Sequence, residues 1–181
     1  MHYRAYMPNP NAPLFHQRYR IPSMRLSGWN YANGRYFVTI CTHNRIPWFG
    51  HIQNKFVCLS DIGSIAHQYW HDIPHHFPHV TLDAYIVMPD HIHGIIMIDQ
   101  RAYNGHIING YTRNPHHQPE WQSGSLGSIM NQFKRACTKR IRDIGCKNFA
   151  WQTRFHDQII HDQRALETIR RYIINNPSKW K

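Results

Sequence analysis

The chain has 181 residues and is rich in aromatic side chains, at 13%. It is strongly basic, with 21 Lys and Arg against 10 Asp and Glu and a net charge of +11. These values favour a folded domain of ordinary size and exclude a disordered chain, and a positive field of this size favours polyanions such as nucleic acid. No apolar stretch has the length of a signal peptide core or a membrane span, so we expect a cytoplasmic protein that does not enter membranes. None of the four cysteines lies in a C-x-x-C pair, which indicates structural thiols.

The first predicted segment is an extended basic arm. Residues 1–30 place four prolines among arginines and tyrosines, a composition typical of an extended chain. Residues 31–181 are expected to form one domain. Within it, residues 35–42 (RYFVTICT) are β-branched and aromatic, as in a strand. From Ser60 or Asp61, apolar residues recur at helical spacing until Pro74, which predicts a helix.

Two more strands are expected in the middle of the chain, at residues 79–88 (HVTLDAYIVM) and 91–99 (HIHGIIMID). The turn between them, Pro89-Asp90, is so short that the strands must pair as an antiparallel hairpin. The second strand is nearly all apolar, which favours an interior position with both faces buried. The polar residues 100–124 that follow are expected to form a long loop.

The last third of the chain predicts two helices around one strand. The first helix is expected from about Ser125 to Arg142, and the segment 149–160 (FAWQTRFHDQII) predicts a fourth strand, straight or bent. Asp162 is a suitable cap for a final helix that ends near Asn175. The order β-α-β-β-α-β-α predicts an α+β fold of the ferredoxin-like type. This fold is a split βαβ antiparallel sheet with helices on one face, here followed by a C-terminal helix.

His91 and His93 are the first candidates for chemistry. They are two residues apart on a predicted strand, so both imidazoles lie on the same face and could bind one metal ion. The spacing alone is equally compatible with two structural histidines. Burying two imidazoles on an interior strand is costly, however, unless each is paired or ligated.

Tyr172 and Asn176 are the second candidates. They are four residues apart at the end of the predicted last helix and therefore share one helix face. By itself the tyrosine could belong to the core, because Leu166, Ile169 and Ile173 have core spacing too, and Asn176 could simply end the helix.

Three segments together resemble a known family. IVMPDHIHGIIMI, YFVTICTHNR and RRYIINNPSKW are similar to motifs of the single-tyrosine HUH transposases, and most similar to the branch associated with repetitive extragenic palindromes, the REP-associated tyrosine transposases. The resemblance extends from about Gly28 to Lys181. One departure is Asp90, where the branch more often has Asn; the carboxylate could support a ligand imidazole from behind.

The resemblance implies a mechanism. By this resemblance, His91 and His93 of this chain would bind a divalent ion, Mg²⁺ or Mn²⁺, with Asn176 as the third protein ligand. Tyr172 would be the nucleophile that cleaves DNA and forms a 5′-phosphotyrosine link. The expected partner is single-stranded or hairpin DNA of repetitive extragenic palindromes, and the enzyme would act as a monomer or a homodimer. The alternative is a domesticated protein that binds the repeats without cutting them.

The expected DNA-binding residues fall into two groups. The basic face of the helix around residues 134–142 suits phosphate contacts, although it could also be a solvated surface. The arm and Arg35 after it are assigned to hairpin recognition mainly by the resemblance. The stretch around His156 and Asp157 also resembles a family motif, for which a structural or base-contacting role is expected. The DNA-binding candidates are Arg18, Arg20, Arg25, Trp29, Arg35, Lys134, Arg135, Lys139, Arg140 and Arg142.

Overall fold

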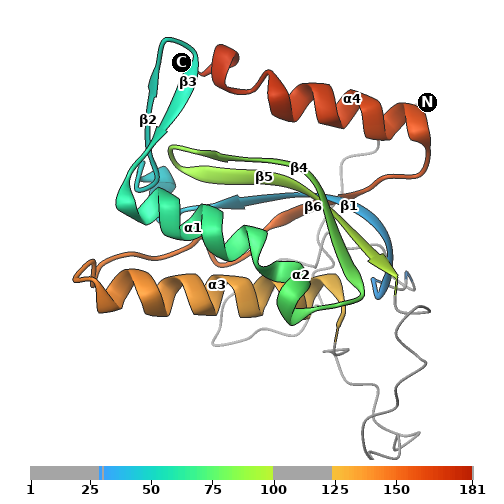
Figure 1. Ribbon diagram of the computed structural model, residues 1–181, viewed down its shortest axis with the longest axis horizontal. Coiled ribbons are helices and arrows are strands. Elements are labelled where there is room, and N and C mark those ends of the chain that lie inside the picture. The colour runs from blue at the N-terminus through green and yellow to red at the C-terminus, as the bar shows by residue number, and fades with distance from the viewer. Residues whose placement is uncertain (1–28, 30, 100–123, 181) are drawn as a thin grey trace, which may run out of the picture.

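The computed structural model describes residue 29, residues 31–99 and residues 124–180. Its centre is a four-stranded antiparallel sheet with the order β4-β5-β1-β6 (Figure 1). Strand β1 thus lies between β5 and β6, the third and fourth strands of this sheet in chain order, which is the ferredoxin-like arrangement, and the predicted fold class is confirmed. The four strands are β1 (Asn33–Cys41), β4 (Val80–Met88), β5 (His91–Asp99) and β6 (His156–Ile159).

Strand β5 lies inside the sheet, as predicted, and pairs with β1 on one side and β4 on the other. Its side chains alternate between two separate layers of the core. Ile92 and Ile96 belong to the large apolar cluster, whereas Ile95 belongs to a smaller cluster with Phe37 of β1. Both faces of this strand are therefore buried, which explains its nearly continuous apolar sequence.

The large cluster lies under helices α1 (Asp61–His71) and α3 (Leu126–Asp143), which cover one face of the sheet (Figure 1). Ser60 and Ser125 cap these helices by accepting hydrogen bonds from backbone N–H groups in the first turn. Trp70 of α1 lies directly on β5 at Gly94, where a Cβ atom would lie 2.2 Å from the indole ring. The glycine thus permits the close approach of helix and sheet. The short helix α2 (Ile73–His76) follows α1 and has Pro74 in its first turn.

Helix α4 (Gln163–Ile174) lies on the opposite face of the sheet from α3 (Figure 1). Asp162 caps it by accepting a hydrogen bond of 2.7 Å from the backbone N–H of Ala165. The helix buries Leu166 and Ile173 in the smaller apolar cluster. Because this cluster is small, polar contacts contribute a larger share of what holds α4 in place.

One such contact joins α4 to β4. Arg170 donates to both oxygens of Asp83, at 2.8 Å and 2.5 Å, and this hydrogen bonding lowers the pKa of the Asp83 carboxyl. Asp83 lies where the register of β4 shifts between Leu82 and Tyr85. The irregularity of the strand therefore coincides with an ion pair to the helix.

In the Asp83→Asn variant the free energy of unfolding should fall by about 1–2 kcal/mol, because Arg170 keeps a charge that is no longer paired. The loss stays moderate because the pair is partly exposed to solvent. The loss should shrink as the pH falls through the lowered pKa of Asp83, since the wild-type carboxylate is then protonated too. Urea denaturation of both proteins over an acidic pH series measures this difference. Lys139→Gln breaks the exposed Lys139–Asp143 pair and should lower the free energy of unfolding much less, because solvent screens that pair. Equal losses in the two variants would contradict this role for Asp83.

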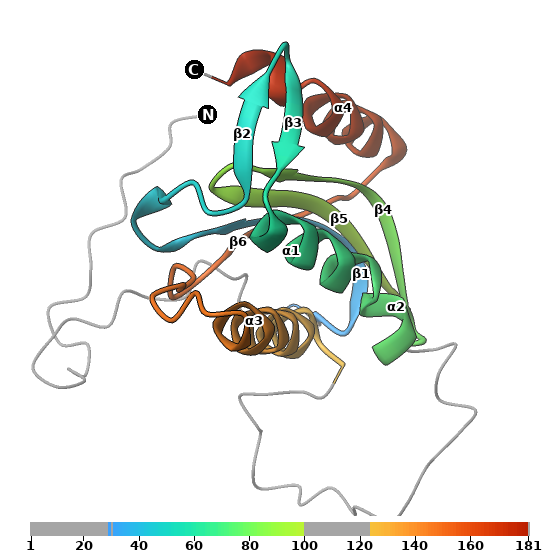
Figure 2. The same cartoon turned by 60° about the vertical axis from the view of Figure 1, so that its left-hand side comes forward.

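A second, two-stranded sheet was not anticipated. Strands β2 (Gly50–Gln53) and β3 (Phe56–Leu59) form a hairpin between β1 and α1. Its turn places Asn54 and Lys55 in the left-handed region, with φ of 50° and 67°, as the favoured two-residue hairpin turn requires. The strands are short and the turn lacks glycine, so the sequence carries a weak signal. The hairpin rises on the side of the sheet that α4 occupies (Figure 2).

Other differences concern the boundaries of elements. The predicted strand over 149–160 is shorter, because only His156–Ile159 pairs with β1, while Trp151 forms an isolated bridge with Thr42. The predicted arm except Trp29, with Arg18, Arg20 and Arg25, and the predicted loop 100–124 except its last residue, lie outside the described residues. Within the described part of the chain, no helix is both long and apolar enough to span a membrane.

Candidate active site

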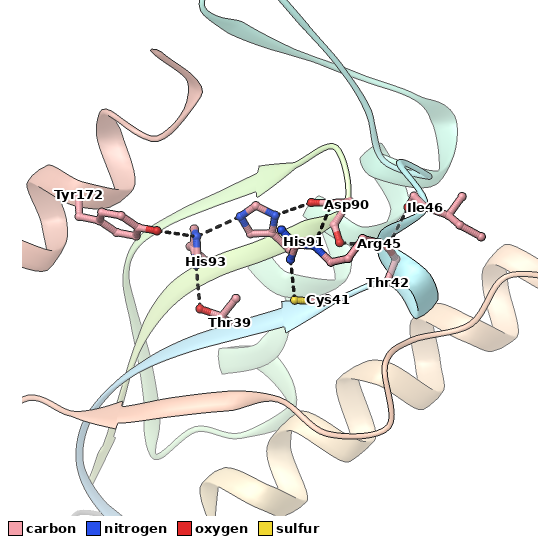
Figure 3. Close-up of polar contacts among 9 residues, drawn as sticks. All are labelled: Thr39, Cys41, Thr42, Arg45, Ile46, Asp90, His91, His93 and Tyr172. Atoms are coloured by element: carbon pink, nitrogen blue, oxygen red, sulfur yellow. Dashed lines mark hydrogen bonds and ion pairs between the residues drawn. The ribbon is translucent and has the colours of Figure 1, made fainter. Parts of the chain in front are cut away.

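The centre of the site is the pair of histidines that begins β5. The Nε2 atoms of His91 and His93 are 3.0 Å apart, and the two residues are only 4% and 6% exposed. Both rings lie on the face of the sheet that α4 covers, as the strand alternation predicted (Figure 3). The sequence interpretation of a same-face pair agrees with this geometry.

The other ring nitrogen of each histidine is held from behind. The Nδ1 of His91 lies 2.6 Å from Oδ1 of Asp90, and Oδ2 of the same carboxylate lies 2.8 Å from Nε of Arg45 (Figure 3). An ionised carboxylate only accepts hydrogen bonds, so in the neutral imidazole the Nδ1–H donates to it and Nε2 keeps its lone pair. The Nδ1 of His93 lies 2.9 Å from the Thr39 hydroxyl, which can accept in the same way.

Burial keeps both imidazoles neutral. Desolvation lowers the pKa of His91, although the neighbouring Asp90 opposes this effect. Desolvation, reinforced by the nearby His91 and Arg45, lowers the pKa of His93 to about 3. At neutral pH the pair therefore presents unprotonated nitrogens, which is the form that binds metal ions.

The shift at His93 predicts a pH dependence of stability. The pKa of this imidazole falls from 6.5 to about 3 on folding, so between these values the unfolded chain binds more protons. The free energy of unfolding should then decrease as the pH drops below 6.5, by up to about 1.4 kcal/mol per pH unit from this group. Urea denaturation of metal-free protein at several pH values measures the slope. The slope should be smaller in His93→Gln, and an unchanged slope would contradict the assignment.

Tyr172 reaches the histidine pair from α4. Its hydroxyl lies 3.3 Å from Nε2 of His93, and its ring meets those of His93 and Phe37 edge to face, with centroids 5.2 Å and 6.0 Å apart. The residue is nevertheless 41% exposed. A hydroxyl that contacts the buried pair while its side chain stays open to solvent can be reached by a bulky substrate.

The other described tyrosines that could compete for this role lie elsewhere. Tyr85 packs against Trp70 in the large cluster and its hydroxyl contacts His67 of α1. Tyr69 also lies in α1 and packs against that cluster. Tyr103 and Tyr111 lie outside the described residues.

Asn176 lies just beyond α4, at the start of the 3-10 helix η3 (Pro177–Lys179). It is 9% exposed, so its amide is largely withdrawn from solvent. Trp180 follows this turn and stacks on the His91 ring, with centroids 5.9 Å apart. The role of Asn176 as a third ligand stays a prediction.

The donor set suits one divalent ion. Two ligands about 2.1 Å from an octahedral ion and at right angles to each other lie about 3.0 Å apart, which matches the separation of the two Nε2 atoms. Over residues 31–99 and 124–180 there is no cluster of three His, Cys, Asp or Glu. A third ligand from the described residues must therefore be of another type, and the buried amide of Asn176 fits that requirement.

Asp90 provides a test of this arrangement. In Asp90→Asn the oxygen that faces His91 is retained, but the negative charge and the ion pair with Arg45 are lost. We expect the affinity for Mn²⁺ to fall by about 10-fold or more, because a carboxylate behind the imidazole orients it and raises its basicity. Electron paramagnetic resonance of free Mn²⁺ during titration measures this loss. Asp61→Asn, an exposed change at the start of α1, should have no effect; equal affinities in both variants would contradict the role.

Those predicted DNA-binding residues that the structure describes are not brought together at this site. Lys134, Arg135, Lys139, Arg140 and Arg142 lie on α3, on the far face of the sheet from Tyr172 (Figure 1). Trp29 donates to the Tyr36 hydroxyl and Arg35 to the carbonyl of His161, both near the far end of β1. His156 lies opposite Thr39 in the register and is exposed.

Sequence reasoning missed three neighbours of the histidines. Thr39 could have been found from the spacing in the first predicted strand. Thr39 and Cys41 are two residues apart, as His91 and His93 are, and the register pairs Thr39 with His93 and Cys41 with His91. Arg45 and Trp180 carry no local signal, since a turn and the chain end bring them to the site.

Comparisons with known proteins identify a sequence relative and a solved structure of similar fold. No protein-family model matches the chain. An uncharacterized protein from Haemophilus influenzae is 36% identical over 172 residues, which cover 94% of this chain and 93% of that protein. A solved REP-associated tyrosine transposase bound to a REP hairpin shares the fold with a TM-score of 0.52 and 22% identity, over 86% of this chain and 74% of its own. A candidate transposase from Deinococcus radiodurans has a TM-score of 0.46 and 15% identity, over 83% of this chain and 95% of its own.

Proposed function

We propose that this chain, which belongs to the same family as the Haemophilus influenzae protein and has the fold of the REP-associated tyrosine transposase, is a metal-dependent DNA transposase. It would cleave and rejoin single-stranded DNA near palindromic hairpin repeats. The observation that supports this most is the position of the Tyr172 hydroxyl, 3.3 Å from one member of a buried, neutral histidine pair. The side chain proposed as the nucleophile thus lies in contact with one of the side chains proposed to bind the metal ion.

The histidines and the amide would hold the ion. Mg²⁺ or Mn²⁺ bound by His91, His93 and Asn176 would act as a Lewis acid on the scissile phosphate. Two imidazoles and an amide favour Mn²⁺ over Mg²⁺. Asp90 and Thr39 would keep the two rings oriented with their Nε2 lone pairs toward this point, so that the site is formed before DNA binds.

Tyr172 would perform the covalent step. Its oxygen attacks phosphorus, the bond from phosphorus to the 3′ oxygen breaks, and the 5′ phosphate remains on the tyrosine. The phenol gives up its proton, and the leaving 3′ oxygen takes one up, so the numbers of bonds and protons balance. Rejoining is the reverse attack by a 3′ hydroxyl, which needs no ATP because the phosphotyrosine bond keeps the energy of the bond that was broken.

The partner is inferred from charge and from the solved relative. A chain with a net charge of +11 attracts a polyanion, and the structure of similar fold holds a REP hairpin. We therefore assign hairpin-bearing DNA as the substrate class. Because α4 reaches the histidines of its own chain, one copy would suffice for cleavage.

A single assay tests this function. The protein is incubated with Mn²⁺ or Mg²⁺ and labelled single-stranded DNA that carries a repeat hairpin from the host genome, and then denatured. We expect a labelled adduct that survives denaturation and is absent when EDTA is added. Binding without cleavage would support instead a domesticated repeat-binding protein, and cleavage without an adduct would support a metallohydrolase.

A further inference from the structure

One cation lies beside the histidine pair and has no part in the covalent step above. Arg45 ends the 3-10 turn η1 (His43–Arg45), which follows β1. Its guanidinium extends toward the His91 ring (Figure 3). Burial lowers the pKa of both His91 and His93, and the charge of Arg45 adds to this effect. A positive charge is therefore held next to the point where the scissile phosphate would bind.

The turn holds Arg45 in a strained backbone. Asn44 and Arg45 have φ of 53° and 56°, in the left-handed region that residues other than glycine seldom adopt. Such a conformation persists where the surrounding structure imposes it. Here the buried Thr42 does so, because its hydroxyl lies 2.7 Å from the carbonyl oxygen of Ile46 and 3.0 Å from that of Asp90. The position of Arg45 is thus fixed to the turn that begins the histidine strand.

Two contacts hold the guanidinium itself. Its Nε lies 2.8 Å from Oδ2 of Asp90, and its Nη1 lies 2.8 Å from Sγ of Cys41. The Arg45 side chain is nevertheless 51% exposed, whereas that of Asp90 is 8% exposed. A guanidinium carries five N–H donors in one plane, more than these contacts use. The carboxylate therefore fixes the cation from the buried side, and the open side can donate to a ligand that comes from solvent.

A phosphodiester fits such a donor. Its non-bridging oxygens share one negative charge, and the planar fork of an arginine matches them in shape and charge. An ion held by His91 and His93 would take one of these oxygens. The other would lack a positive partner beside buried imidazoles, which is costly for a charged group. Arg45 can supply that partner.

We propose that Arg45 binds the phosphate that Tyr172 attacks, by donating from its guanidinium to the non-bridging oxygen that the metal ion leaves free. The inference rests on the proposed function in taking that phosphate as the substrate, and deepens it by naming a residue that touches the reacting group. In the transition state, negative charge spreads over the equatorial oxygens of phosphorus. A guanidinium that Asp90 has fixed in advance stabilises this charge without reorganising.

A substrate with one oxygen replaced tests the contact directly. The adduct assay locates the scissile linkage in the wild type, and a methylphosphonate at that linkage then replaces one non-bridging oxygen by a methyl group and removes the charge. On the ordinary substrate we expect Arg45→Gln to form the adduct about 100-fold more slowly than the wild type. On the diastereomer that lacks the contacted oxygen, the difference should shrink to less than about 10-fold, because the arginine has no charge left to stabilise.

Metal binding separates this contact from an effect through Asp90. Arg45→Lys keeps a positive charge beside that carboxylate but loses the planar fork. We expect this variant to bind Mn²⁺ as the wild type does, and to form the adduct more slowly even when Mn²⁺ is saturating. A return to the wild-type rate at saturating Mn²⁺ would overturn the proposal.

Binding without metal gives a readout that needs no cleavage. Arg164→Gln is the matched control, because it removes the same charge from an exposed arginine at the opposite end of α4 from Tyr172. The measurement is fluorescence anisotropy in EDTA with a labelled, unpaired oligonucleotide from the flank of the repeat. We expect Arg45→Gln to bind about 10-fold more weakly than Arg164→Gln, with a salt dependence reduced by about one phosphate contact. Circular dichroism checks that both variants fold.

The outcomes are distinct. A difference between the wild type and Arg45→Gln that is the same on the ordinary substrate and on both methylphosphonates would overturn the proposal, since the arginine would then act only through Asp90. Equal affinities of Arg45→Gln and Arg164→Gln in EDTA would overturn it too. A wild type that forms no adduct would contradict the transposase function, and the metal-free affinities would then decide whether Arg45 binds a phosphate.

Discussion

Replacing Tyr172 with phenylalanine is expected to abolish the covalent protein–DNA adduct, lowering its rate of formation by about 10⁴-fold or more, as for other enzymes that lose their nucleophile. The reason is that only this hydroxyl, among the described tyrosines, contacts the histidine pair. The phenyl ring can keep its contacts with Phe37 and His93. Since the lost hydrogen bond is long and partly exposed, stability should change by less than about 1 kcal/mol.

The measurement is the amount of denaturation-resistant adduct over time with Mn²⁺ and hairpin-bearing DNA. Tyr85→Phe is the matched control, because it also removes a tyrosine hydroxyl that contacts a histidine, but on the other face of the sheet. That variant should form the adduct at the wild-type rate. An adduct that persists in Tyr172→Phe would show that another residue is the nucleophile.

His93→Gln is expected to have the second largest effect, a loss of at least about 100-fold in Mn²⁺ affinity. This exceeds the loss from removing a residue that only supports a ligand, because the variant replaces the imidazole that lies between His91 and Tyr172. Adduct formation should fall with it. The metal-free variant should nevertheless stay folded, and below about pH 6 it should lose less stability than the wild type, since it lacks a buried imidazole that resists protonation.

Calorimetric titration with Mn²⁺ and urea denaturation measure these two effects on the same samples. His67→Gln removes a histidine from α1 that contacts Tyr85 rather than the pair, and it should bind Mn²⁺ as the wild type does. Wild-type affinity in His93→Gln, with adduct formation lost, would place this histidine in the handling of substrate instead of metal.

The three helices with the strongest predicted patterns and the interior strand form close to where they were expected. Their signals are local: serine and aspartate caps, apolar periods and a short turn between two strands. The hairpin β2–β3 was missed because its four-residue strands carry little periodicity and its turn depends on left-handed Asn54 and Lys55 instead of a glycine.

The amino-acid sequence by itself determined which residues could act. The alternation of a strand puts His91 and His93 on one face, because this relation depends only on backbone geometry. The predicted helix face shared by Tyr172 and Asn176 is not formed as such, because α4 ends at Ile174 and Asn176 lies beyond it. Tertiary structure alone decided that the tyrosine meets the histidines, that Arg45 pairs with Asp90 behind them, and that the basic face of α3 lies across the sheet from them. Those relations depend on how distant segments pack, through contacts such as Arg170 with Asp83, 87 positions apart, which no local pattern encodes.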